Sequence, residues 1–491
     1  MKKLSHCSPR GASVIMVGIM LLAGAIVFFW TTPEEVAASA KSYSIPNRIV
    51  TDHTNMIQGP FQDGPAVTKK CLECHANAGE EMMTSVHWEW LGKPVKVLGV
   101  EEPVRIGKKN LINNFCVSAK NNEKKCTACH AGYGWTEEEY DFSKKENVDC
   151  LVCHDHSGQY VKGNYGYPAK GVDLEAAAKS VTFPNRSNCG SCHFNGGGGN
   201  GVKHGDLDNS LMYPSARIDV HMGKYDFVCI DCHQTENHQV KGRSMGVSVE
   251  RANGVDCLDC HENDLHRDQR IDAHTNTVAC QTCHIPEFAV DDPTKMTWDW
   301  STAGQDLDIK DKHQYMKIKG SFKYDTRVTP EYDWYNGTNK RYLLGDKISP
   351  EKTTRLNPPL GDIYDANARI TPFKIHRGKQ IYDTKYKTLM APTTAGKGGF
   401  WNEFDWDKAL RIGAEKTGMK YSGHYDFATT EMHMRLSHMV AEKEKALLCE
   451  DCHSDNGRME WNELGYENDP IHHGSRLISD YSNIHLGAHN E

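Results

Sequence analysis

The pattern of apolar and polar residues along the chain predicts few long regular elements. One continuous apolar run occupies residues 12–30, close to the amino terminus. Helical spacing of apolar positions occurs at residues 404–417 and 429–448, which are the two clearest predicted helices of the second half. Glycine- and asparagine-rich segments interrupt the remainder, most visibly GGGGNG at residues 196–201. We therefore expect a mainly helical, loop-rich fold with little β-sheet.

The apolar run near the amino terminus has the pattern of an export signal. Lys2, Lys3 and Arg10 lie on its amino-terminal side, and a small-x-small site at residues 38–40 follows it. We predict a signal peptide, residues 1–40, that is cleaved after Ala40. The alternative is an uncleaved anchor, since a run of 19 apolar residues is at the short end for spanning a bilayer. Both interpretations predict a periplasmic body, with membrane contact only in the second.

The composition provides little apolar material for a conventional core. Hydrophobic residues make up 38% of the 491 residues, and the mean hydropathy is −0.63. Globular domains usually contain about 45–50% apolar residues, so another source of buried apolar surface is expected. The formal net charge of −8 argues against a nucleic-acid partner.

Sixteen of the 18 cysteines belong to eight repeats of Cys-x-x-Cys-His, and only Cys7 and Cys116 remain. In chain order the repeats contain Cys71, Cys74 and His75; Cys126, Cys129 and His130; Cys150, Cys153 and His154; Cys189, Cys192 and His193; Cys229, Cys232 and His233; Cys257, Cys260 and His261; Cys280, Cys283 and His284; and Cys449, Cys452 and His453. Two thiols at this spacing attach a haem, and the histidine that follows binds its iron. Disulfides or zinc sites would accept the paired cysteines, but neither requires a histidine after every pair. The motifs predict a multihaem cytochrome c with eight covalently bound c-type haems.

The motifs are distributed unevenly. Residues 41–290 contain seven of them, at intervals of 23 to 55 residues, so neighbouring haems must lie close together. Residues 291–491 contain a long motif-free stretch and the eighth motif. We expect a haem-dense domain at 41–290, a carboxy-terminal region at 291–491, and a fold organised around packed haems. Porphyrins are large and apolar, and would supply the buried surface that the composition lacks.

Electron-transfer haems commonly have a second axial histidine. The chain has 26 histidines, and the eight motifs use eight of them. Eight others lie within or just before the haem-dense stretches, and we expect seven of these to be distal ligands. They are His53, His87, His204, His221, His238, His266, His274 and His438, the last on the predicted helix at 429–448. Weaker candidates are His156, His313, His376, His424 and His433.

Several blocks outside the haem motifs resemble one known family, the octahaem tetrathionate reductases. The blocks are GKKNLINNFC at 107–116, AGYGW at 131–135, ENVDCLVCHD at 146–155, CGSCHFNGGGGNGVKHGD at 189–206, WYNG at 334–337, RYLLGDK at 341–347 and SHMVA at 437–441. They are long and specific, and they are spread over most of the chain after residue 40. A general multihaem electron carrier would not share them.

The resemblance implies a haem layout similar to that of hydroxylamine oxidoreductase and the pentahaem nitrite reductases. Seven haems of the family have two histidine ligands, and the second haem in sequence has a distal lysine. The matching positions are His130 for the proximal ligand and Lys203 for the lysine, with Cys116 near the same pocket. A lysine beside a glycine-rich loop would otherwise be interpreted as a solvated residue. Burial beside a cationic iron would lower its pKa and allow it to bind.

One position departs from the family pattern. An acidic residue lies three positions before the lysine in the family, and Asn200 occupies that position here. Asp206 and His204 are the candidates to replace it as a proton donor. The resemblance also implies that a structural calcium ion is possible.

The resemblance implies an enzyme that reduces a small inorganic substrate: tetrathionate, nitrite or hydroxylamine. The expected electron donor is a cytochrome or a quinol-linked dehydrogenase. One alternative is hydroxylamine oxidation, although no block resembles the tyrosine region of hydroxylamine oxidoreductase. The other is a non-enzymatic electron-transfer protein, for which the chain has enough histidines.

Overall fold

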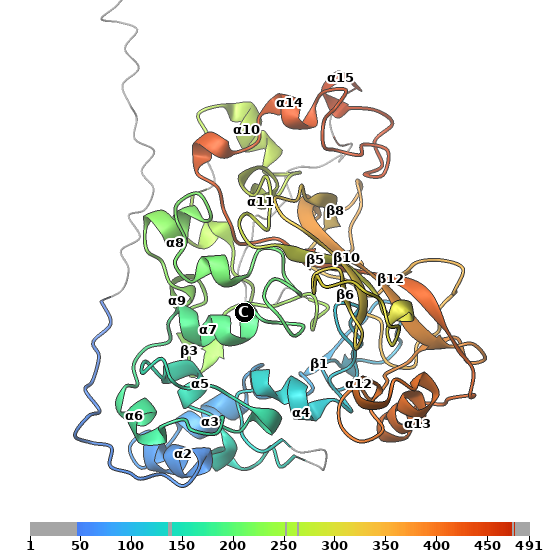
Figure 1. Cartoon of the computed structure of the whole chain (residues 1–491). Helices are drawn as coiled ribbons and strands as arrows, with labels where there is room; N and C mark the ends of the chain where they lie inside the picture. Colours follow the sequence, from blue (N-terminus) through green and yellow to red (C-terminus); the bar gives the residue numbers. More distant parts are fainter. Residues whose placement is uncertain (1–46, 136–139, 251–252, 263–264, 474–475, 477–491) are drawn as a thin grey trace, which may run out of the picture.

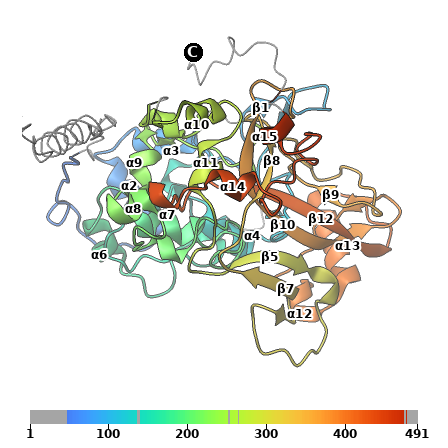
Figure 2. The same cartoon turned by 90° about the horizontal axis from the view of Figure 1, so that it is seen from above.

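The computed structural model describes residues 47–135, 140–250, 253–262, 265–473 and 476. The predicted signal peptide and Cys7 lie outside these ranges. Short helices occupy one side of the molecule, and a mixed sheet with α12 (Phe400–Glu403) and α13 (Trp406–Thr417) occupies the other (Figures 1 and 2). Within the described residues, no helix is long and apolar enough to span a membrane.

The haem motifs lie on or beside very short helices. These are α2 (Gly64–Leu72), α4 (Glu123–Cys126), α5 (Leu151–His154), α7 (Arg186–His193), α9 (Cys229–Cys232), the 3₁₀ turn η5 (Cys257–Asp259), α11 (Cys280–His284) and α14 (Cys449–Cys452). A single helical turn suits the attachment of a haem. Because residues three apart lie on the same helix face, both thiols of a motif point to one side.

The remaining short elements lie between these turns, within the sheet region or after the last motif. The helices are α3 (Ala78–Met83), α6 (Leu174–Lys179), α8 (Val220–Lys224), α10 (Gln269–His274) and α15 (Pro470–His473). The 3₁₀ turns are η1 (Thr127–Cys129), η2 (Lys145–Asn147), η3 (Asn164–Gly166), η4 (Asn209–Leu211), η6 (Trp300–Thr302) and η7 (Lys443–Lys445). Two small hairpins pair β1 (Pro94–Val95) with β2 (Val104–Arg105), and β3 (Thr235–Glu236) with β4 (Gln239–Val240).

An eight-stranded sheet lies between residues 294 and 435. Its strands are β5 (Thr294–Asp299), β6 (Tyr315–Met316), β7 (Gly320–Asp325), β8 (Glu331–Tyr335), β9 (Thr354–Arg355), β10 (Arg369–Asp383), β11 (Thr388–Leu389) and β12 (Tyr425–Arg435). The order is β6-β7-β5-β10-β12-β9, with β8 and β11 also paired to β10. β10 is antiparallel to β12 and parallel to β5. The central strand therefore joins most of the sheet.

The prediction of little β-sheet is wrong, and β10 shows why. This strand is buried on both faces, and its buried residues include Lys374, His376 and Gln380 as well as apolar ones. A strand covered on both sides has no alternation of apolar and polar residues, so the pattern does not reveal it.

The helix predicted at residues 429–448 is also wrong. Residues 425–435 form β12, and His438 follows it in an irregular segment. Met432, Leu436 and Val440 recur every four residues, which imitates a helix, but pairing with β10 determines the conformation. The helix predicted at 404–417 is confirmed as α13, which Asp405 caps at its start and Gly418 ends in a left-handed conformation.

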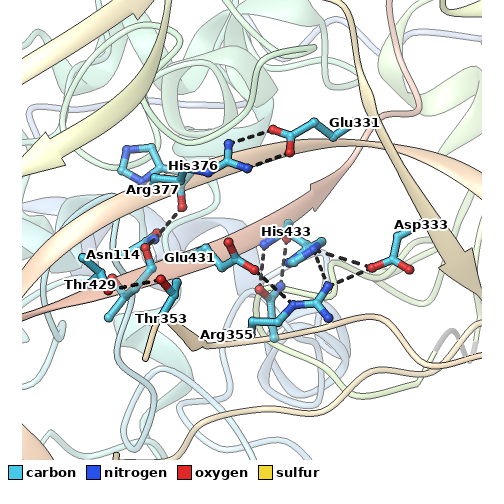
Figure 3. A network of polar contacts seen from close by, with 12 residues as sticks. Asn114, Glu331, Asp333, Thr353, Arg355, His376, Arg377, Thr429, Glu431 and His433 are labelled. Carbon is cyan, nitrogen blue, oxygen red and sulfur yellow. Dashed lines mark hydrogen bonds and ion pairs between the residues drawn. The ribbon is translucent and has the colours of Figure 1, made fainter. Parts of the chain in front are cut away.

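Polar networks fasten the sheet to its surroundings (Figure 3). The Arg355 guanidinium donates to Asp333 and lies 2.9 Å from the ring Nε2 of buried His433. Asn114 donates a hydrogen bond of 2.6 Å to the His376 carbonyl of β10. The segment that ends at Cys116 is therefore anchored to the central strand.

A conventional aromatic core lies between the sheet and α12–α13. Trp298, Trp300, Phe400 and Trp406 are buried there, and the rings of Phe400 and Trp406 stack with 3.6 Å between centroids. This core is separate from the haem motifs, which surround a large interior space instead.

Candidate functional site

The haem-motif side of the molecule encloses a cavity of about 3180 Å³. Residues from the second to the eighth motif line it. Ordinary pockets for one small molecule measure about 300–1,000 Å³, so this space suits several large ligands. Its walls are made of the motif turns and the loops that connect them.

Pairs of imidazole rings face one another across the positions where irons would bind. The ring centroids are 6.3 Å apart for His53 and His75, 6.1 Å for His87 and His193, 6.0 Å for His221 and His261, 6.2 Å for His233 and His438, 6.3 Å for His266 and His284, and 6.3 Å for His274 and His453. A metal–imidazole bond is about 2 Å and the ring nitrogen lies about 1 Å from the ring centre, so two imidazoles on opposite sides of a metal have centres about 6 Å apart. These six pairs therefore fit a haem iron between them.

Hydrogen bonds orient many of these rings through Nδ1, which leaves Nε2 for an iron. Backbone carbonyls hold His53 (Thr51, 2.9 Å), His154 (Thr182, 2.8 Å), His233 (Lys241, 2.7 Å) and His274 (Arg270, 2.6 Å). Carboxylates hold His238 (Glu81, 2.8 Å), His266 (Asp272, 2.8 Å), His438 (Asp206, 3.2 Å) and His453 (Asp469, 2.6 Å). Partners of this kind fix the orientation of metal-binding histidines.

His238 is the neighbour of the third motif. Burial lowers the pKa of His154, and the nearby His238 ring lowers it further. Both histidines line the cavity. Six of the eight candidate distal histidines thus have a ring contact with a motif histidine, and His238 interacts with His154 through charge. His204 has no ring contact with a motif histidine among the described residues; it interacts with His193 through charge, but the His193 ring already faces His87.

The second motif is different. The Nε2 atom of His130 lies 2.8 Å from the Trp88 carbonyl oxygen, and its buried Nδ1 has no hydrogen-bond partner among the described residues. The ring packs against Trp88 and Trp135, with centroids 5.0 and 4.7 Å away. Burial lowers the pKa of His130 to about 3. In this orientation the ring offers only Nδ1 to an iron.

Lys203 lies near the same motif. It is half-buried, lines the cavity, and has its Nζ 5.8 Å from the centre of the Phe115 ring. Burial lowers the pKa of Lys203 to about 7; Lys108 and Arg341 lower it further, and Cys129 of the second motif opposes them. An amine with this pKa is neutral in a large fraction of molecules near pH 7 and has a free lone pair.

The other predicted site residues fall into two groups. Cys116 is half-buried and lines the cavity together with Lys203. Asn200 points elsewhere: its amide donates to Asp292 (2.7 Å) and accepts from the Asn209 backbone (2.8 Å). Asp206 is buried against His438 at the fifth motif, where hydrogen bonds and positive charge outweigh burial and lower its pKa to about 2. Asn200 and Asp206 are therefore held by partners other than Lys203, although Asp206, like Lys203, lines the cavity.

Some cavity residues were not predicted. Lys108 and Lys319 line the cavity, and Lys319 lies at the end near Trp298 and Trp401. Lysines in loops without a motif give no signal in the sequence that distinguishes them from ordinary surface residues. Together with Lys203 they make this part of the cavity positively charged. In the ranges that the structure describes, no cluster of three or more His, Cys, Asp or Glu side chains could hold a separate metal ion.

Neighbouring motifs touch through their cysteines. In four pairs of thiols each partner shifts the pKa of the other: Cys71 and Cys150, Cys129 and Cys192, Cys189 and Cys229, and Cys257 and Cys280. Charge interactions also link Cys153 with Cys189, Cys232 with Cys260, and Cys283 with Cys449. The motifs thus form a continuous row from the first through the third to the eighth, with the second beside the fourth.

Comparison with known proteins agrees with this arrangement. The family model "cytochrome c bacterial" matches residues 295–456, and the model "cytochrome c7 and related cytochrome c" matches residues 215–285. An uncharacterised protein of Archaeoglobus fulgidus is 25% identical over 240 residues, which cover 38% of this chain and 80% of that protein.

A solved structure covers most of the chain. The crystal structure of an octahaem cytochrome c from Shewanella oneidensis matches with 48% sequence identity and a TM-score of 0.81, over 86% of this chain and 98% of that one. With the eight motifs and the paired histidines, this likeness shows a protein with covalently bound c-type haems. The chain belongs to the octahaem cytochromes c.

Proposed function

We propose that this cytochrome is a periplasmic reductase that acts on small nitrogen or sulfur compounds at the haem of the second motif. The observation that carries the proposal is the contrast between motifs. Six motif histidines have a ring contact with a second histidine, and His154 interacts with His238 through charge. The ring of His130 packs instead against Trp88 and Trp135, and the cavity beside it contains Lys203.

In this proposal seven haems each have two histidine ligands and serve electron transfer. The distal ligands are His53, His87, His221, His238, His266, His274 and His438, for the first, fourth, sixth, third, seventh, eighth and fifth motifs respectively. The second haem has His130 and Lys203. Because the Nε2 atom of His130 lies against the Trp88 carbonyl, the ring must turn within its aromatic surroundings before Nε2 can face an iron.

The protein residues around Lys203 suit an anionic or polar substrate. When bound, the second haem supplies electrons and a coordination position. Lys203, Lys108 and Lys319 attract negative charge into the cavity and stabilise it there. A lysine with a pKa of about 7 can also hold a proton and release it near neutral pH. Cys116 also lines this cavity.

The row of motifs suits a reaction of several electrons. Electrons that enter at one end have a continuous series of neighbouring sites that leads to the fourth motif, next to the second. A cytochrome or a quinol-linked dehydrogenase would donate them. Nitrite, hydroxylamine and tetrathionate are the proposed substrates, since their reduction consumes from two to several electrons.

Electron paramagnetic resonance of the holoprotein, combined with assays, tests this proposal. We expect one low-spin signal from a histidine–lysine haem besides the bis-histidine signals. Lys203→Ala should convert that signal to high spin and lower viologen-linked reduction of at least one substrate by roughly 10²-fold. Lys109→Ala, at an exposed lysine outside the cavity lining, is the matched control and should retain both properties.

Other outcomes point to other functions. Bis-histidine signals alone, with no reduction of any of the three compounds, would identify an electron-transfer protein. Oxidation of hydroxylamine faster than its reduction would identify an oxidising enzyme. Unchanged rates in Lys203→Ala would refute the assignment of the site.

A further inference from the structure

The loop that carries Lys203 is held by a buried lysine on the central strand of the sheet. We propose that Lys374, together with Thr294, is a positioning residue that fixes the backbone of Lys203 relative to the second motif. The inference rests on the proposed function, because it concerns the placement of the proposed distal ligand. It assigns a role to a residue that touches neither the cavity nor a motif.

The contacts of Lys374 are specific. Its side chain is fully buried on β10, and its Nζ donates to the carbonyl oxygens of Val202 (3.1 Å) and Lys203 (3.1 Å) and to the Thr294 hydroxyl (2.6 Å). An ammonium group has three N–H donors, and these three acceptors use all of them.

Thr294, at the start of β5, also holds the backbone of the Lys203 loop. Its hydroxyl lies 2.7 Å from the Gly201 carbonyl oxygen and 3.3 Å from that of His204. The backbone N–H of Lys295 also donates to Gly201, at 3.3 Å. Four successive carbonyls, of residues 201–204, are therefore held by two strands of the sheet.

These hydrogen bonds leave the backbone of residues 201–204 little freedom to move. Gly201 has a positive φ of 62°, and a Cβ there would lie 2.8 Å from the Pro293 carbonyl oxygen. A side chain at Gly205 would overlap the Phe288 ring. Although the loop is rich in glycine, movement at Lys203 is thus confined to its own side chain. Exchange between the lysine and a substrate would occur by side-chain rotation over a fixed backbone.

The energetic cost of Lys374 supports a positional role. The side chain of Lys374 is fully buried on β10. A buried amine is costly, and an apolar side chain of the same length would fill the space without that cost. The hydrogen bonds that offset the burial of the Lys374 amine go to the carbonyls of the Lys203 loop and to Thr294, whose hydroxyl binds the same loop.

Spectroscopy of Lys374→Met in the holoprotein tests the inference. Methionine has a similar length but no donor, so the loop carbonyls lose their partner. We expect loss of the histidine–lysine signal, appearance of high-spin haem, and a fall in kcat of about 10²-fold, with the bis-histidine signals unchanged as an internal control. Lys379→Met, at an exposed position of the same strand, should resemble the wild type.

Thr294→Val is the second variant, since it removes one hydroxyl and keeps the shape of the side chain. It should weaken the histidine–lysine signal in the same direction, and it decides the question if Lys374→Met yields no folded holoprotein. A wild-type protein without a histidine–lysine signal would overturn both the proposed function and this inference. If the wild-type protein has the signal and both variants leave it unchanged, only the inference is overturned. Where Lys374→Met does not fold, an unchanged signal in Thr294→Val alone has the same consequence.

Discussion

At the fifth motif, a single carboxylate determines the environment of a proposed iron ligand. Asp206 is buried and accepts hydrogen bonds from the backbone N–H groups of Ser437 (2.7 Å) and His438 (3.0 Å), and it lies 3.2 Å from Nδ1 of His438. A carboxylate on Nδ1 makes an imidazole a stronger electron donor to its metal. The opposite ring, His233, has only the neutral Lys241 carbonyl. The charge of Asp206 is therefore expected to favour the oxidised form of this haem.

Asp206→Asn should raise the reduction potential of the fifth haem. The amide keeps the shape of the side chain and loses its charge. The expected rise is roughly 60–120 mV, which corresponds to a change of about ten- to a hundredfold in the affinity of the ligand for oxidised relative to reduced iron. A redox titration followed by electron paramagnetic resonance measures it. Asp208→Asn is the matched control: among the described residues this buried carboxylate accepts hydrogen bonds only from Ser210, so the loss of its charge should leave the potential unchanged. Equal potentials in Asp206→Asn and wild type would contradict the assigned role.

Among the elements, α8 (Val220–Lys224) shows how a very short helix can place a ligand. Asp219 caps its start and accepts from Met222 (2.9 Å), and its second oxygen accepts from Val440 (3.1 Å). The helix then packs closely against the chain at residues 215–216 through Gly223. Contacts at both ends hold His221 so that its ring lies 6.0 Å from that of His261.

Gly223→Ala should displace α8, because its Cβ would overlap the backbone of Ser215. A helix of five residues has no stability of its own to resist the displacement. We expect the sixth haem to lose one of its two histidines, seen as conversion of one bis-histidine signal to high spin, with a loss of about 1–3 kcal/mol in stability. Lys224→Ala, which removes an exposed ion pair with Glu442 and a contact with the Tyr225 ring, should show neither effect. An unaltered spectrum of Gly223→Ala would show that α8 does not position His221.

On the scale of the whole molecule, two kinds of interior coexist. The sheet side has its own apolar clusters, such as Trp298, Trp300, Phe400 and Trp406. The motif side has helices of four to nine residues around a cavity of about 3180 Å³. Helices this short are unstable by themselves, and the apolar clusters among them are small, such as that of Val67, Leu151 and Ala177. We therefore expect the haems and their covalent links to supply much of the stability of that side.

The chain produced without haem attachment should therefore retain the sheet and lose the motif side. We expect limited proteolysis of this apoprotein to leave a resistant fragment of about residues 290–440, and circular dichroism to show more β-structure relative to helix than the holoprotein does. Mass spectrometry identifies the fragment. Uniform digestion of the whole apoprotein, or equal resistance of both sides, would contradict the division.

Local sequence determined the features that depend on covalent chemistry. Eight Cys-x-x-Cys-His repeats specify eight haem attachments, because spacing along the chain alone decides which thiols and which histidine meet one porphyrin. The helix α13 followed from its apolar spacing and its caps, which are also local. The likeness of whole sequence blocks indicated the family, but the bottom-up pattern alone left Lys203 as an ordinary lysine.

Only the tertiary structure decided what depends on distant contacts. It decided the sheet, since β10 is buried on both faces and has polar residues inside, and it decided that His438 follows a strand instead of lying on a helix. It paired His53 with His75 of the first motif, and His438 with His233 of the fifth motif, which lies about two hundred residues earlier in the chain. It also placed Lys374 beneath the Lys203 loop. Contacts between residues so far apart in the chain depend on how the whole chain packs, and no periodicity in the sequence encodes them.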